Sequence, residues 1–189
     1  MMDAKHILRK VCAPFRRLVR NREGSATVEF VVFVPVFVFM FVSSFEVAVI
    51  NIRQGMLDQA LDKTVRELRL GTWPNPTPAI IKADLCGRTA GIIANCESQL
   101  MLELTPVPRD SWTVPAAGAN CVDRGSTVEP TVSFNQGGEN EMMIVRACLL
   151  IDPFFPGTKL ALMLEENEGD GIALIATSGF VNEPILGEL

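Results

Sequence analysis

Gly24, Glu29 and Phe30, near the N-terminus, have types and a spacing that could carry chemistry. If a peptidase cut the bond after Gly24, Ser25 would carry a new α-amine, and Glu29 would lie about one helical turn away. Glu29 stands at the start of a long apolar run, where an ionised acid costs free energy unless a positive charge neutralises it. An ammonium on a neighbouring chain would supply that charge. The pattern therefore indicates helices that dock in a fixed register.

Glu29 also has a simpler explanation. A carboxylate near the start of a helix is stabilised by the helix dipole. In that case Glu29 needs neither a cleavage nor a neighbouring chain. The residues alone leave both explanations open.

The apolar run from Gly24 to Ile50 is the element that must position these residues. About 20 apolar residues cross a bilayer as a helix, which satisfies its own backbone groups in lipid. The sequence therefore predicts a transmembrane helix over residues 25–50. Pro35 should kink this helix, because proline removes a backbone hydrogen bond and crowds the preceding turn. Glu46 is expected at the outer interface, where water can reach it.

Charge is distributed unevenly on the two sides of the span. Residues 1–24 form a basic leader, in which seven basic and two acidic residues give a net charge of +5. The remaining residues carry a net charge of −10. Positive charge beside a span stays cytoplasmic, so we expect a cytoplasmic N-terminus and an exported domain over residues 51–189. The absence of a second basic patch argues against a nucleic-acid partner. An uncleaved signal anchor remains an alternative for the leader.

Helical periodicity continues beyond the span. One apolar face predicts a single helix to about Leu70, ended by Gly71, and its residues are Ile50, Leu57, Leu61, Val65 and Leu68. Thr77 before Pro78 is a typical N-cap, and it predicts a second helix to Asn95. The apolar face of that helix would hold Ile81, Leu85, Ile92 and Cys96.

The second half of the chain has the alternation of β-strands. We expect strands near residues 100–104, 141–151 and 172–181, and a weak one at 127–134. Residues 136–140 should form a turn, and 156–164 a short helix or loop. Helices followed by strands indicate an α+β fold with a small antiparallel sheet covered by helix.

Four cysteines lie in the expected exported part, which suggests two disulfides. Three connectivities are possible. Proximity in sequence favours Cys86 with Cys96 and Cys121 with Cys148. The only histidine is His6 and no Cys-x-x-Cys occurs, which argues against a zinc site.

Nothing else in the sequence argues for catalysis or a cofactor. The acidic stretch 165–171 offers oxygens to calcium but lacks the EF-hand spacing, and acidic turns are usually only solvated. Without a histidine beyond position 6 there is no acid–base relay of the usual kind. We therefore expect no enzyme, no catalytic residues and no bound metal.

The stretch from Arg20 to Phe30, with Pro35 and Glu46, resembles the N-terminus of TadE-like proteins, the minor pseudopilins of the tight-adherence (Flp, type IVc) pilus system. The family pattern is a basic leader, Gly, four residues, Glu and an aromatic residue, which Gly24, Glu29 and Phe30 match. The segment 180–184 is similar to the Asn-Glu-Pro ending of the family.

This resemblance implies a pilin-like fold and cleavage between Gly24 and Ser25 by a prepilin peptidase. The mature helix would pack through Glu29 and Phe30 with other pilins and the inner-membrane assembly platform. The protein would be a single-pass inner-membrane protein with a periplasmic domain. A TadE or a TadF role, and entry into the fibre, stay open. The alternative is an uncleaved, membrane-anchored periplasmic binding protein.

Overall fold

The computed structural model describes residues 25–113, 120–124, 132–156 and 171–183. The expected leader, most of the acidic stretch, most of the weak strand at 127–134 and nearly all of 156–164 lie outside these residues. The chain divides into two compact units, Met1–Ser44 and Phe45–Leu189, and each is described by itself.

Helix α2 (Ser25–Arg69) is the first described element, and it extends from one unit into the other. This confirms the predicted single helix. Gly71 has a φ of +65°, a left-handed conformation that glycine adopts without steric cost. The amides of Gly71 and Thr72 donate to the carbonyls of Leu68 and Glu67, so the exposed end of the helix is satisfied.

The second helix is shorter than predicted. Helix α3 (Pro78–Arg88) begins as expected, with the Thr77 hydroxyl accepting from the Ile80 amide at 3.4 Å, but it stops seven residues before Asn95. Ala90 and Gly91 then take positive φ, and Cys96 opens a separate short helix, α4 (Cys96–Gln99). Ile92 is consequently exposed, and the neighbouring Ile93 is buried instead.

The Cys86–Cys96 disulfide explains this early stop. Ten residues of continuous helix would separate the two cysteines by about 15 Å along the axis. Their Cα atoms lie 5.7 Å apart, so the chain has to turn back between them. The predicted helix and the predicted pairing of these cysteines were therefore incompatible.

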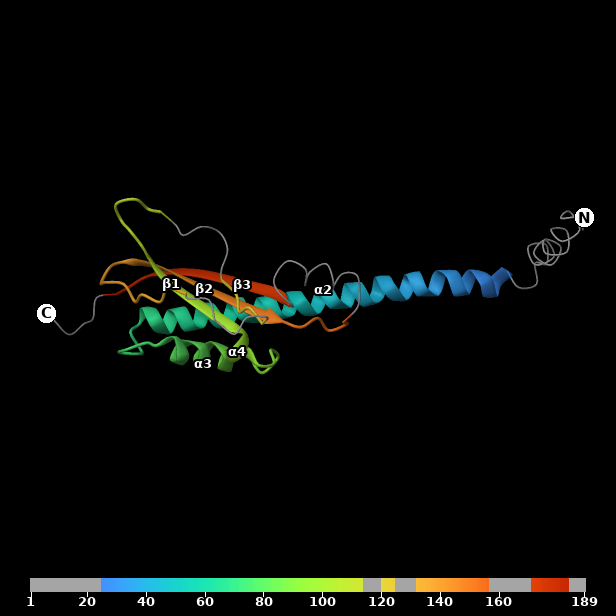
Figure 1. The fold of residues 1–189 in the computed structure, drawn as a ribbon, viewed down its shortest axis with the longest axis horizontal. Helices are drawn as coiled ribbons and strands as arrows, with labels where there is room; N and C mark the ends of the chain where they lie inside the picture. Colours follow the sequence, from blue (N-terminus) through green and yellow to red (C-terminus); the bar gives the residue numbers. More distant parts are fainter. Residues whose placement is uncertain (1–24, 114–119, 125–131, 157–170, 184–189) are drawn as a thin grey trace, which may run out of the picture. The chain divides into compact units, whose positions relative to one another are not determined.

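Three strands form one antiparallel sheet in the order β1 (Leu100–Val107), β2 (Met142–Ile151), β3 (Ile172–Val181). Leu100 lies opposite Leu149, and Leu149 lies opposite Leu174, so alternate residues of all three strands share a face. Figure 1 shows the sheet beside α2 and α3. The α+β prediction is confirmed. In the described part of the weak strand, residues 132–134, Phe134 forms a bridge parallel to Leu104.

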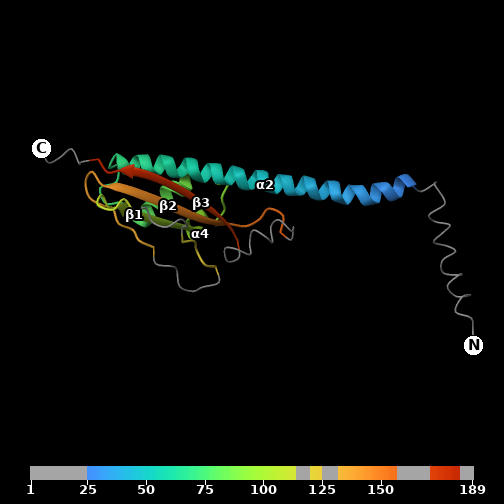
Figure 2. The same cartoon turned by 90° about the horizontal axis from the view of Figure 1, so that it is seen from above.

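The core lies between one face of the sheet and the two helices. Figure 2 shows α2 running along the sheet. The predicted apolar faces supply most of the helical contribution to the buried cluster, which includes Leu57, Leu61, Val65, Ile81 and Leu85. Ile50 and Leu68 pack against its edges.

Polar contacts fix how α2 lies along β3. The Gln54 amide donates to the Ile175 carbonyl at 3.0 Å, and the Ser178 hydroxyl donates to Asp62 at 3.1 Å. Arg69 pairs with Glu183 at 2.9 Å. Residue numbers rise together along both elements, so α2 and β3 run in the same direction.

The opposite face of the sheet carries the second disulfide. Cys148 is fully buried in β2 and bonds Cys121, with a Cα–Cα distance of 5.1 Å. The structure thus contains the two pairings that proximity in sequence favoured. Each distance lies in the usual disulfide range.

Candidate functional site on the N-terminal helix

The first unit exposes an almost entirely apolar helix surface. Between Val28 and Phe41 all the large hydrophobic side chains except Val34 are about half or more exposed, and they include Phe30, Phe33, Phe37, Met40 and Phe41. An 18-residue window has a mean hydropathy of 2.3, and none of it is buried. An exposed apolar surface of this extent marks a membrane or protein interaction site. By length and composition, this helix could cross a membrane.

Glu29 is the single charged residue in the described part of this unit. Ser25 is the first residue of α2, which puts Glu29 four positions on and about 6 Å further along the axis. Glu29 and the adjacent Phe30 are both exposed. Gly24 lies just outside the described residues. Pairing between Glu29 and an amine at residue 25 of a neighbouring chain stays a prediction.

Pro35 lies inside α2, and the helix is unbroken there. Its nitrogen cannot donate to the carbonyl four residues earlier, so one backbone acceptor in this turn loses its usual partner. The kink expected at this position stays a prediction.

Glu46 is not at a wet interface, as the sequence suggested, but buried, with 1% of its surface exposed. Its two carboxylate oxygens accept the backbone amides of Phe154 and Phe155, at 2.8 and 2.9 Å. These amides follow β2, more than a hundred residues away along the chain. Two hydrogen bonds to a charged acceptor offset much of the cost of burying it.

The sequence contained a partial signal for this arrangement. Glu46 stands among apolar residues just past the predicted span, and a carboxylate in such surroundings needs partners. Its partners are main-chain groups, which carry no residue-type signature. They could not be identified from the sequence.

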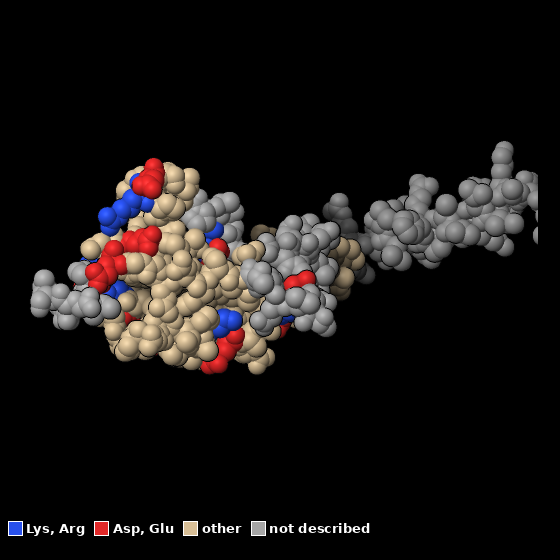
Figure 3. Space-filling model, turned by 60° about the vertical axis from the view of Figure 1, so that its left-hand side comes forward, with Lys and Arg blue, Asp and Glu red and all other residues tan. Residues whose placement is uncertain are grey.

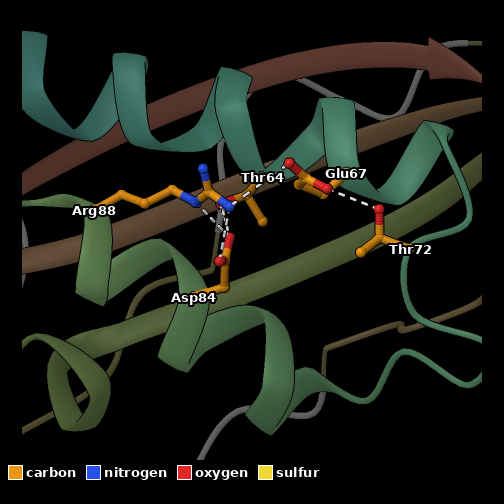
Figure 4. A network of polar contacts seen from close by, with 5 residues as sticks. All are labelled: Thr64, Glu67, Thr72, Asp84 and Arg88. Atoms are coloured by element: carbon orange, nitrogen blue, oxygen red, sulfur yellow. Dashed lines mark hydrogen bonds and ion pairs between the residues drawn. The ribbon is translucent and has the colours of Figure 1, made fainter.

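A second polar network joins α2 to α3 (Figure 4). Arg88 forms two hydrogen bonds with the Asp84 carboxylate, at 2.7 and 2.9 Å, and the buried Thr64 hydroxyl donates to Asp84 at 2.8 Å. Glu67 lies 4.0 Å from Arg88 and accepts from Thr72. Burial raises the pKa of Asp84, but the hydrogen bonds from Arg88 and Thr64 outweigh this and hold the pKa below its ordinary value of 3.8. The network is structural, because each charged group has a partner within it.

The second unit shows no concentration of a single charge on the face in Figure 3, where acidic and basic side chains lie in small separate groups among uncharged residues. A cavity of about 500 Å³ lies where α2 ends, lined in part by Leu68, Trp73, Pro76 and Phe180. Among the described residues no cluster of His, Cys, Asp or Glu is placed to hold a metal ion.

Comparison with known proteins found a match that includes the exposed apolar part of α2. Residues 24–66 match the profile of the TadE-like protein family. Over this segment the chain is similar to TadE-like proteins. Neither a curated protein nor a solved structure matches the chain.

The TadE-like segment begins at Gly24 and includes Glu29, Phe30, Pro35 and Glu46. The resemblance seen in the sequence is thus confirmed from Gly24 onwards, and its basic part before Gly24 lies outside the matched segment. The segment ends within the buried part of α2 and does not reach the Asn-Glu-Pro ending, so that part of the resemblance stays a prediction.

Proposed function

We propose that this protein is a minor pseudopilin needed for assembly of tight-adherence (Flp, type IVc) pili. A prepilin peptidase removes the leader after Gly24, and the new helix end then packs against other pilins in the inner membrane. The observation that carries this proposal is the exposed apolar helix with a single carboxylate in its first two turns, which lies inside the TadE-like segment.

The chemistry of docking follows from the position of Glu29. An ionised carboxylate costs about 2.5–3.5 kcal/mol at the centre of a bilayer and less near its edge. The α-amine of Ser25 on a neighbouring chain neutralises it, and this reduces the cost only when the two helices stand in one register. Charge pairing therefore sets the stagger between subunits, and the apolar side chains around Glu29 supply the contact area.

The domain formed by the second unit stays on the periplasmic side and presents its surface to partners. Its two disulfides suit an oxidising compartment. The assembly platform in the inner membrane and the prepilin peptidase are the other expected partners. This role requires no reaction by the protein itself.

The decisive experiment is to determine the N-terminal residue of the native protein extracted from membranes. We expect Ser25 in cells that contain the prepilin peptidase, and a leader still attached in cells that lack it. A Gly24→Val variant serves as the matched control, because the bulkier residue at the cleaved bond should keep the leader attached.

An intact leader on the native protein would contradict the proposal. The chain would then be an uncleaved, membrane-anchored protein, and its domain would be sought as a binding module. Cleavage that persists without the prepilin peptidase would exclude that enzyme as the processing partner.

A further inference from the structure

Three phenylalanine rings form a cluster at the start of the second unit. Phe45 on α2 lies 5.6 Å from Phe154 and 6.0 Å from Phe155, measured between ring centroids, and the last two are 5.0 Å apart. The rings are tilted or edge-on to one another, which are favourable arrangements for aromatic pairs. One ring comes from the helix and two come from the segment that follows β2.

Several contacts hold this segment in place. Glu46 accepts both amides of the Phe154–Phe155 pair. Arg53 donates to the Asp152 carbonyl at 3.0 Å, and Arg124 forms an ion pair with the Asp152 carboxylate. The main chain that carries the two rings is thereby fixed against α2 at both of its ends.

Two of the three rings are nevertheless exposed. Phe45 is 44% exposed and Phe154 is 53% exposed. Neither ring belongs to the buried cluster, so the contacts that fix this segment also hold apolar rings at the surface. Exposed apolar groups gathered in one patch indicate a partner.

The position of Phe45 in the chain indicates which partner. It directly follows Ser44, the last residue of the first unit. From Ser25 to Ser44, α2 has 20 residues, which is about 30 Å of helix and equals the thickness of the hydrocarbon core. Phe45 thus stands at the level where the chain leaves the hydrocarbon. Trp and Tyr are enriched at that depth, and Phe side chains of interfacial segments bury into the boundary between headgroups and acyl chains.

We propose that Phe45, Phe154 and Phe155 form an aromatic foot that inserts into the lipid interface on the periplasmic side. This inference rests on the membrane-spanning part of the proposed function. The foot gives the domain a second contact with the bilayer beside the span, because Phe154 reaches lipid from a segment distant in sequence. The buried Glu46 is the positioning residue that sets the direction of these rings.

Tryptophan fluorescence in vesicles tests this proposal with the full chain. The native tryptophans, Trp73 and Trp112, are replaced by phenylalanine, and one reporter is introduced by Phe154→Trp. The protein is reconstituted into phosphatidylcholine–phosphatidylglycerol vesicles with lipids brominated on the acyl chain. We expect these lipids to quench most of the reporter emission.

Two further single-tryptophan proteins complete the design. Phe39→Trp reports on the span itself and should also be quenched. The aqueous control keeps Trp112 as the single tryptophan, through Trp73→Phe. Trp112 is 65% exposed. It follows the end of β1 that pairs with Met142, whereas Phe154 follows the other end of β2. Trp112 should be quenched by acrylamide and not by brominated lipid.

The outcomes separate the two proposals. If Phe39→Trp is quenched by lipid and Phe154→Trp behaves like Trp112, the aromatic foot is wrong and the span stands. If Phe154→Trp is shielded from acrylamide but not quenched by lipid, the rings contact protein, and the lipid contact is again wrong. If Phe39→Trp is not quenched, the span fails and the foot fails with it.

Discussion

Glu46 accepts a hydrogen bond of 2.8 Å from the backbone amide of Phe154, across 108 residues of sequence. The neighbouring amide of Phe155 binds the other carboxylate oxygen. One acidic side chain on the helix thus fixes the segment after the central strand. This contact connects the TadE-like segment to the rest of the domain.

Replacing Glu46 should destabilise the domain. Glu46→Ala leaves two partly buried amides without their acceptor, and we expect a loss of about 2–4 kcal/mol in the free energy of unfolding. Glu46→Gln keeps one carbonyl oxygen and should lose less. Urea midpoints from pulse proteolysis of the full chain in detergent measure both. The exposed Glu97→Ala is the control, and an equal loss there would contradict this role for Glu46.

Glu29 should matter for association and not for folding. Glu29→Ala removes the carboxylate from an exposed position, so we expect unchanged insertion, cleavage and thermal unfolding. Co-purification with other pilins and the number of pili per cell should fall strongly, because the charge that pairs with the neighbouring amine is gone. Glu29→Asp, which keeps the charge on a shorter side chain, should retain part of both. Normal piliation in Glu29→Ala would refute the pairing.

The Asp84–Arg88 pair should contribute to stability in a pH-dependent way. The folded-state pKa of Asp84 lies below 3.8, so its contribution is complete above that pH and is lost as the pH falls towards the folded-state value. Asp84→Asn should cost about 1 kcal/mol at pH 7 and much less at pH 3. Unfolding free energies at the two pH values test this. The exposed Asp110→Asn serves as control, and a cost for Asp84→Asn that is equal at both pH values would contradict the prediction.

The two disulfides should differ in their contribution. The Cys121–Cys148 bond closes a longer segment, with a sequence separation of 27 against 10 for Cys86–Cys96. Loop-closure entropy predicts stabilisation of about 3.5 and about 2.7 kcal/mol, respectively. Unfolding of the two paired Cys→Ala variants measures this order. Mass spectrometry of non-reduced peptides checks the pairing, and any cross-paired peptide would overturn it.

Local patterns predicted most of the fold. The 3.6-residue period identified Leu57, Leu61 and Val65 as the buried face of α2, and the apolar alternation located all three strands of the sheet. Thr77 and Pro78 marked the start of α3 correctly. These features depend on neighbours in sequence, so one chain was enough to find them.

The errors arose where distant parts of the chain meet. The helix predicted to reach Asn95 ends at Arg88, because a disulfide to Cys96 requires the chain to turn. Glu46 was predicted to be solvated. In the structure its carboxylate oxygens accept main-chain amides, which every residue except proline has, so no residue type pointed to these partners. Comparing the helix length with the cysteine spacing would have revealed the first error. For the second, the apolar neighbours of Glu46 indicated that its carboxylate needs partners, but the sequence could not identify them.

The inward face of α2 between Leu57 and Val65 belongs to the same buried cluster as the sheet, and this limits how a soluble form of the protein can be produced. A truncated version that starts after this helix would expose one side of its hydrophobic core and should aggregate. The boundary for expression therefore lies before Phe45, so that Glu46 and the whole core-forming stretch are retained while the apolar residues ahead of it are removed.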